Sequence, residues 1–241
     1  MDISFWTQCN PKIAIDHTTK KYFGKYLYKI VVYAPGGRLI DDKGGIAESL
    51  LHRRDVIKNI SHGSWWGHRF NKDLENADIE FLEILRDIRR NPIGVKLRVE
   101  EPRVQIYAET ENELINLLKN QLHNFQHYVE IVSGPENSAA EAVLNAGAII
   151  RKTNIGYTHK VIIRDGRYTT DIKCGLLSYL KNLSSDTVHV SDALTSILTG
   201  RSGYIWNAYF YTNDPSVTIF LNLIHPNLVL NIHELVVLPH K

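Results

Sequence analysis

The segment from Val95 to Ser133 constrains the fold most, because its hydrophobic pattern follows two different periods within a short length. Apolar and polar residues alternate over 95–99 and again over 104–108, and Glu101-Pro102 lies between the two runs. Alternation of this kind is typical of strands that bury one face, and proline in the short connection favours a turn. We therefore predict a β-hairpin in the first part of the segment.

The second part of the segment changes to helical spacing. Thr110 suits a helix N-cap and has Glu113 three positions later, which is the pattern of a capping box. The leucines within 114–122 recur at helical spacing, and 128–132 returns to a strand pattern. The order predicted for the whole segment is strand, turn, strand, helix and strand.

A similar order recurs from Tyr204 to Leu238. A single shift along the sequence places Tyr211 on Tyr107 and Asp214 on Thr110, so a strand that ends in tyrosine precedes a helix N-cap twice. Asp214 is followed by a proline, which independently indicates a helix start. Opening strands are predicted before both copies, at 28–32 and 159–163.

The order strand, helix, strand, strand, helix, strand is that of the ferredoxin-like βαββαβ arrangement. We predict an α+β protein of two ferredoxin-like units from an internal duplication, each an antiparallel sheet with helices on one face. Chance similarity of short amphipathic patterns is the alternative. The predicted divisions are a first unit at 1–135 with an N-terminal extension and an inserted loop at 61–75, a linker helix at 136–156, and a second unit at 157–241.

Composition limits the class of protein. With 241 residues, of which 44% are hydrophobic and 22% charged, the chain can bury the core of one large or two small domains. Cys9 and Cys174 fit neither a disulfide framework nor a zinc finger, and no apolar run is long enough for a membrane span. We expect a cytoplasmic protein in a reducing compartment, without membrane attachment. At a net charge of +2, nucleic-acid binding would depend on local clusters of basic residues.

The inserted loop has no counterpart in the second half and carries unusual side chains. Trp65 and Trp66 lie close to Arg69, with His62 and His68 on either side of the indoles. Loops inserted into a rigid scaffold often carry function. In one interpretation the indoles stack on bases while the histidines and Arg69 contact phosphate or move protons. In the other, the tryptophans anchor the loop to the core and the histidines are ordinary surface residues.

Basic residues cluster in two further parts of the first half. The helix predicted over 75–90 ends in arginines, and the following hairpin carries outward-facing basic residues, which suit either a phosphate-binding surface or a solvated face. The run 20–26 interleaves lysines with aromatic residues, as in a stacking platform or in an edge strand protected by lysines. The candidate nucleic-acid-binding residues are Trp65, Trp66, Arg69, Arg86, Arg89, Arg90, Lys96, Arg98, Arg103 and Lys25.

The sequence contains only weak signals for a metal site or a catalytic site. His123 and His127 stand four positions apart near the end of a predicted helix, a spacing that can hold a metal. Histidines at a helix end are also favoured by the helix dipole. His62 or His68 as a general base lacks an identifiable carboxylate to orient it. We predict no cofactor.

Three functional hypotheses follow from these patterns. The first is a non-enzymatic protein that binds RNA or single-stranded DNA through the basic and aromatic residues named above. The second is a structural or assembly subunit of a larger complex or a viral particle, in which the aromatic strand predicted over 204–211 packs on a protein partner or another copy of the chain. The third is a hydrolase or nuclease that uses the loop histidines.

Overall fold

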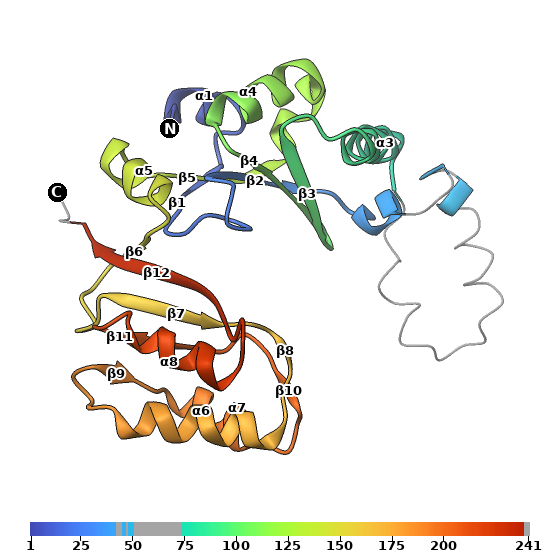
Figure 1. Cartoon of the computed structure of the whole chain (residues 1–241). Coiled ribbons are helices and arrows are strands. Elements are labelled where there is room, and N and C mark those ends of the chain that lie inside the picture. The colour runs from blue at the N-terminus through green and yellow to red at the C-terminus, as the bar shows by residue number, and fades with distance from the viewer. Residues whose placement is uncertain (42–44, 47, 51–73, 239–241) are drawn as a thin grey trace. The chain divides into compact units, whose positions relative to one another are not determined.

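The computed structural model describes residues 1–41, 45–46, 48–50 and 74–238. The chain divides into two compact units, Met1–Glu141 and Ala142–Lys241, and each unit has a five-stranded mixed sheet with helices (Figure 1). The predicted α+β class is confirmed. The division falls within α5 (Ser138–Asn145), inside the segment for which the sequence predicts a linker helix. None of the described helices is long and apolar enough to span a bilayer.

The first unit is built around the sheet of order β1-β5-β2-β4-β3, in which β1 runs parallel to β5 and the other neighbours are antiparallel. Helices α1 and α4 lie on one side of this sheet (Figure 1). The elements are α1 (Ile3–Cys9), β1 (Ala14–His17), β2 (Tyr28–Tyr33), η1 (Gly37–Asp41), α3 (Asn76–Arg90), β3 (Val95–Glu100), β4 (Arg103–Ala108), α4 (Glu111–Asn120), η3 (His123–Tyr128) and β5 (Val129–Gly134).

The predicted hairpin is confirmed as β3 and β4, and its alternation sets the two faces of the sheet. Val104, Ile106 and Ala108 are 0% exposed, because they face the core. The intervening Tyr107 lies on the opposite face, where it pairs with Lys29 of β2 and Lys96 of β3. The basic residues of the hairpin therefore lie on the sheet face away from the core.

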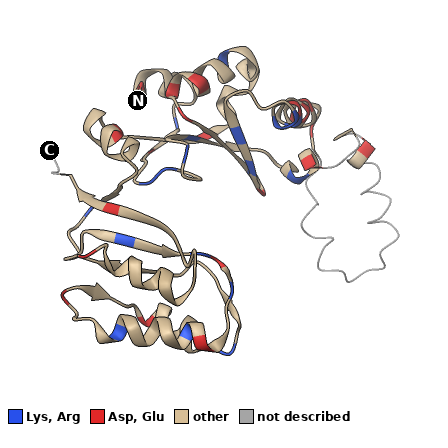
Figure 2. Cartoon of the chain, in the orientation of Figure 1, with Lys and Arg blue, Asp and Glu red and all other residues tan. Residues whose placement is uncertain are grey.

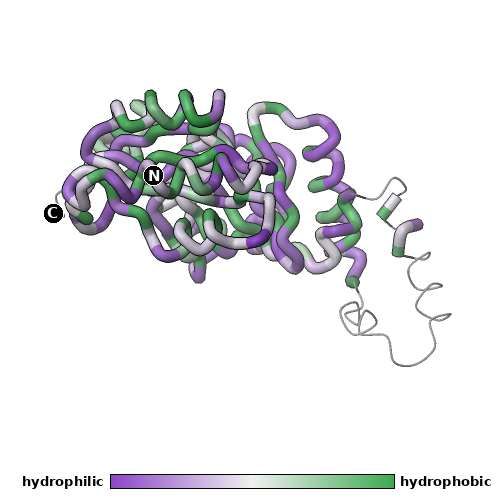
Figure 3. The backbone as a smooth tube through the Cα atoms, turned by 60° about the horizontal axis from the view of Figure 1, so that its bottom comes forward, coloured by the Kyte–Doolittle hydropathy of each residue, from purple (hydrophilic) through white to green (hydrophobic). Residues whose placement is uncertain are grey.

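Helix α3 is amphipathic, with hydrophilic and hydrophobic residues along its length (Figure 3). Its core side includes Phe81, which is 1% exposed and stacks on Tyr128 of η3 at 4.9 Å between ring centroids. Phe81 also lies 5.0 Å from the ring of Phe125. This aromatic contact joins α3 to the segment that precedes β5.

The predicted capping box at the start of α4 is confirmed. The Glu113 backbone N–H donates to Thr110 Oγ1 at 3.4 Å, and the Thr110 backbone N–H donates to Glu113 Oε2 at 2.9 Å. The helix is shorter than the leucine pattern predicts, because α4 ends at Asn120 and the chain continues as the 3₁₀ segment η3, which is kinked at Phe125.

Replacing Thr110 with alanine is expected to lower the free energy of unfolding by about 1 kcal/mol, because it removes the acceptor of an otherwise unpaired helix N–H. Thr19→Ala, at an exposed loop threonine of the same unit, is the matched control and should change stability by less than about 0.5 kcal/mol. Urea denaturation measures both. Equal midpoints for the two variants would contradict a stabilising role for this cap.

The second unit contains a sheet of order β6-β12-β7-β11-β9, in which β6 runs parallel to β12, and a separate antiparallel ribbon of β8 and β10. Its core holds fully buried residues from strands and helices, such as Val161, Leu176 and Phe210. The elements are β6 (Ile149–Arg151), β7 (His159–Ile163), β8 (Gly166–Arg167), α6 (Thr170–Asn182), β9 (Val188–His189), α7 (Asp192–Thr199), β10 (Tyr204–Ile205), β11 (Tyr209–Thr212), α8 (Val217–Ile224) and β12 (Val229–Val237).

Two features of the second unit differ from the sequence prediction. The aromatic strand predicted over 204–211 is split into β10 and β11, because Asn207 adopts φ +53° and its N–H donates to Asp165 Oδ1 at 2.8 Å. Asn tolerates this left-handed conformation better than most residues do. The helix predicted to begin at Asp214 has Ser216 as its N-cap, and Asp214 Oδ1 instead accepts a hydrogen bond from the Ser216 N–H at 2.9 Å.

Candidate nucleic-acid interface

The predicted loop residues Trp65, Trp66, Arg69, His62 and His68 lie outside the described residues. Of the remaining candidate basic residues, Lys25 lies in the loop between β1 and β2, and the others lie on α3 or on the β3–β4 hairpin. Arg86, Arg89 and Arg90 lie on α3, whereas Lys96, Arg98 and Arg103 lie on the strands of the β3–β4 hairpin. Figure 2 shows Lys and Arg interspersed with Asp and Glu along this unit.

Most of these basic side chains have a carboxylate partner. An ion pair with a carboxylate cancels the net charge of the cation, so these residues attract an anionic ligand less than their number suggests. The N–O pairs are Arg86–Glu83 at 2.6 Å, Arg89–Asp41 at 2.7 Å, Arg98–Glu100 at 2.9 Å, Arg103–Glu130 at 2.6 Å and Lys25–Glu109 at 2.8 Å.

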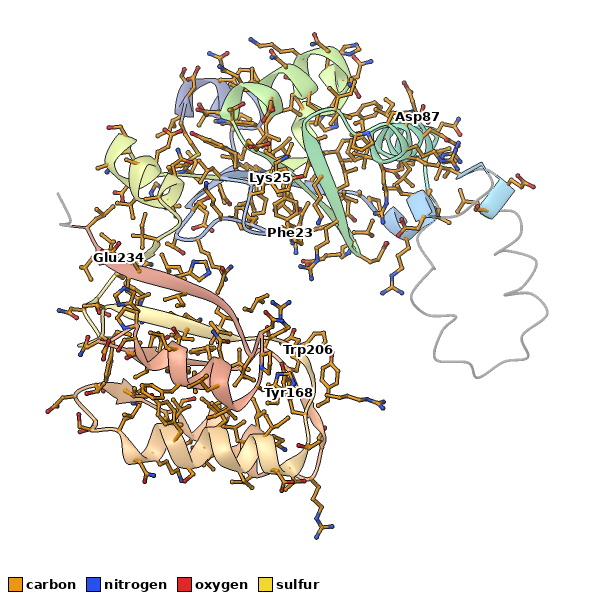
Figure 4. The ribbon with its side chains drawn as sticks, viewed as in Figure 1. Phe23, Lys25, Asp87, Tyr168, Trp206 and Glu234 are labelled. Atoms are coloured by element: carbon orange, nitrogen blue, oxygen red, sulfur yellow. The ribbon has the colours of Figure 1, made fainter. Side chains whose placement is uncertain are left out.

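Lys96 differs, because its described contact is with a ring. Its Nζ lies 3.7 Å from the ring centroid of Phe23, and Lys29 Nζ lies 5.1 Å from that of Tyr22. These lysines and rings belong to one group of side chains around Tyr107, which we call the aromatic-lysine cluster. Its members are Tyr22, Phe23, Tyr26, Tyr107, Lys29 and Lys96. Figure 4 shows Phe23 on the side of the first sheet away from α1 and α4.

Tyr107 is the centre of the cluster. Three rings from the segment 22–26 surround it, at centroid distances of 5.2 Å for Tyr22, 5.0 Å for Phe23 and 6.3 Å for Tyr26. Burial raises the pKa of the Tyr107 hydroxyl. The hydroxyl donates to Gln105 Oε1, so Tyr107 is fixed in position.

The loop that joins β1 to β2 carries these three rings, which pack on Tyr107. Thr18 Oγ1 donates to the Leu27 carbonyl at 2.8 Å and closes the base of the loop. At its tip the Lys25 N–H donates to the Tyr22 carbonyl at 3.0 Å. The two central residues of this turn, Phe23 and Gly24, both have positive φ, at +53° and +72°, as in a type I′ turn. The run 20–26 is therefore a turn packed on Tyr107, not an edge strand.

Phe23 is an unusual residue at this turn. A bulky side chain in the left-handed region costs about 1 to 3 kcal/mol, and such positions concentrate at functional sites. The ring is nonetheless 52% exposed, so burial offsets only part of this cost. Packing within the first unit therefore does not by itself account for a phenylalanine at this turn.

The second unit contains a comparable arrangement around Tyr211. Tyr211 pairs with Lys160 of β7 and His189 of β9. Tyr157, from the loop between β6 and β7, stacks 6.4 Å from the Tyr211 ring, and Lys160 Nζ lies 3.5 Å from the ring centroid of Tyr209. Burial raises the pKa of Tyr211 as well.

A cavity of about 300 Å³ lies beside this second cluster, lined in part by Arg151, Asn154 and Tyr157. The sequence pattern shows the strand tyrosines of both units. It does not show Tyr22 and Tyr157 as their partners, because a ring supplied by a loop has no periodicity.

The predicted metal-site residues His123 and His127 are both exposed and lie in η3. In a 3₁₀ segment of about three residues per turn, positions four apart do not share a face, unlike in an α-helix. Among the described residues, no group of three or more His, Cys, Asp or Glu side chains could hold a metal ion.

Comparison of the chain with protein-family models, with curated proteins and with solved structures finds no match. The functional argument therefore depends on the described residues alone.

Proposed function

We propose that the two units are copies of one ferredoxin-like βαββαβ module, each preceded by an additional strand. The support is topological. Numbered along the chain, with the β8–β10 ribbon left out, the strands of both sheets follow the order 1-5-2-4-3, and in both the first strand runs parallel to the last. Tyr107 and Tyr211 lie opposite lysines, Lys29 and Lys160, in the central pairs of strands. Superposition of 26–133 on 157–238 tests the proposal, since Tyr107 should coincide with Tyr211.

We propose further that the chain binds RNA or single-stranded DNA without catalysing a reaction. The observation that carries this function is the aromatic-lysine cluster on the sheet face away from the helices. Proteins that bind single strands combine rings on which bases stack with cations that follow the phosphates. Phe23 supplies an exposed ring, and Lys96 supplies a cation directly beside it.

The charge near Phe23 supports an anionic partner. Four lysines lie on or near the cluster, and within the described parts of the chain none of them forms an ion pair with a carboxylate. Unneutralised lysines attract phosphates and release counterions when they bind them. These lysines are Lys20, Lys21, Lys29 and Lys96. The inserted-loop residues Trp65, Trp66 and Arg69 remain part of this proposal from the sequence alone.

Replacing Phe23 with asparagine separates binding from folding. Asparagine tolerates positive φ, so the relief of strain offsets the lost ring contacts and the free energy of unfolding should stay within about 1 kcal/mol of the original. Loss of the stacking ring should weaken binding to oligo(U) or oligo(dT) by about 1 to 3 kcal/mol. Fluorescence anisotropy of labelled oligonucleotides at low salt measures the affinity.

The matched control is Ile93→Asn, which changes an apolar residue that is 83% exposed in the same unit and outside the cluster. It should bind like the original chain. Lys96→Ala should weaken binding with a shallower dependence on salt, because one phosphate contact is lost. Folded Phe23→Asn and Lys96→Ala variants with unchanged affinity would refute the proposed interface.

The assembly hypothesis is the second candidate, and helix α8 favours it. Ile219, Phe220 and Leu223 are 63%, 56% and 77% exposed and lie on one side of the helix. An exposed apolar face of this kind is typical of protein interfaces. A monomeric mass by analytical ultracentrifugation at high concentration would argue against self-assembly through this face.

A further inference from the structure

Two aromatic side chains at the β8–β10 ribbon lie outside the core: Tyr204 is in β10 and Trp206 directly follows that strand. Trp206 is 61% exposed and Tyr204 is 42% exposed. Their ring centroids lie 6.0 Å apart with 33° between the planes. Figure 4 labels Trp206 and Tyr168 at the end of the second unit where β8 and β10 lie. Exposed rings that lie next to one another form an apolar patch, and such patches often mark interaction sites.

The backbone that carries these rings is held in place by several long-range hydrogen bonds. The buried ammonium of Lys173, 3% exposed, donates to the carbonyl oxygens of Gly200 at 2.6 Å and Ser202 at 2.9 Å. The Tyr168 N–H donates to the Gly203 carbonyl at 2.7 Å, and the Asn207 N–H donates to Asp165 Oδ1 at 2.8 Å. The two exposed rings therefore project from an ordered ribbon, which reduces the entropy lost when a ligand binds.

Around the rings, three arginines outnumber the one carboxylate described there, that of Asp165, which accepts the Asn207 N–H. Arg167 lies directly opposite Tyr204 in the ribbon. Arg164 and Arg201 lie close by in the chain, and all three arginines are exposed. Among the described residues, none of the three forms an ion pair with a carboxylate. Guanidinium groups next to exposed rings complement a ligand that carries both flat rings and phosphates.

We infer that the β8–β10 ribbon is a second binding site for single-stranded nucleic acid. Trp206 and Tyr204 stack on bases, and Arg167 contacts the phosphate backbone. A duplex does not present its base faces, so the site selects single strands. The inference rests on the proposed function and assigns part of it to the second unit.

The test uses the full chain with fluorescein-labelled oligo(U) and oligo(dT) at low salt. Trp206→Ala is expected to weaken binding by about 5- to 150-fold, which corresponds to the loss of one stacked base. Trp206→Phe should retain most of the affinity, because a ring remains. Arg167→Gln should weaken binding with a shallower salt dependence. Leu230→Ala, at an apolar residue of the same unit that is 47% exposed, is the matched control and should bind normally.

The possible outcomes separate this inference from the proposed function. Binding that Phe23→Asn weakens and Trp206→Ala leaves unchanged would overturn the ribbon site and keep the first interface. Equal weakening by Leu230→Ala and Trp206→Ala would also overturn it, because the loss of binding would then follow from the removal of any exposed apolar side chain. No binding of either oligonucleotide by the original chain would remove both. If Trp206→Ala lowers the melting temperature, Trp206→Phe and Arg167→Gln decide the question.

Discussion

Replacing Trp6 with alanine is expected to lower the free energy of unfolding of the first unit by about 3 to 5 kcal/mol, the usual cost of removing a buried tryptophan. Trp6 is 0% exposed, and its ring meets that of Phe5 edge to face at 5.2 Å. Its Nε1–H donates to Glu111 Oε1 at 2.7 Å, which joins α1 to the first turn of α4. The substitution therefore leaves a large cavity and also separates two helices.

Two further variants of α1 separate the contribution of the hydrogen bond from that of the buried ring and provide a control. Trp6→Phe keeps a ring and loses the hydrogen bond, so it should be less destabilising than Trp6→Ala. Ile3→Ala, at a residue of the same helix that is 53% exposed, should change stability by less than about 0.5 kcal/mol. Urea denaturation followed by circular dichroism measures all three. A Trp6→Ala variant as stable as Ile3→Ala would show that α1 does not contribute to the core.

The elements that could be predicted from the sequence are those that local patterns determine. The β3–β4 hairpin follows from alternation over a few residues, and the α4 start follows from Thr110 and Glu113, which are three positions apart. The parallel edge strands could not be predicted in this way. β1 and β6 are short, and they pair with β5 and β12, which lie far along the chain. No local period records such a pairing.

The candidate site was predictable in its residue types but not in its arrangement. The sequence shows a run of lysines and aromatic residues at 20–26, but its role depends on contact with Tyr107, far along the chain. The same limit applies to the basic residues. Arg103 pairs with Glu130, and Arg89 pairs with Asp41. The members of each pair are far apart in the sequence, so no local pattern shows the contact. Charge clusters in a sequence therefore overstate the charge that a ligand meets.

The burial of Lys173 could not be predicted from the sequence either, since a lysine in an amphipathic helix is expected to be exposed to solvent. In the structure it is buried in α6, and its ammonium replaces water as the donor to two carbonyl groups. One of these belongs to Gly200, the C-cap of α7, where a cation also favours the helix dipole. Lys173 thus connects α6, the end of α7 and the segment that leads into the β8–β10 ribbon.

Replacing Lys173 with alanine is accordingly expected to destabilise the second unit by about 3 kcal/mol, because hydrogen bonds from a charged donor contribute about 1.5 to 3 kcal/mol each and two carbonyl groups lose their partner. Lys173→Met keeps most of the stem, so its remaining deficit reports the hydrogen bonds alone. Lys181→Ala, at an exposed lysine in the last turn of the same helix, is the matched control and should fall within about 0.5 kcal/mol of the original chain. If Lys173→Ala unfolds at the same urea concentration as Lys181→Ala, the ammonium does not hold the segment that leads into the ribbon, and the order of that segment depends on the Tyr168–Gly203 and Asn207–Asp165 hydrogen bonds alone.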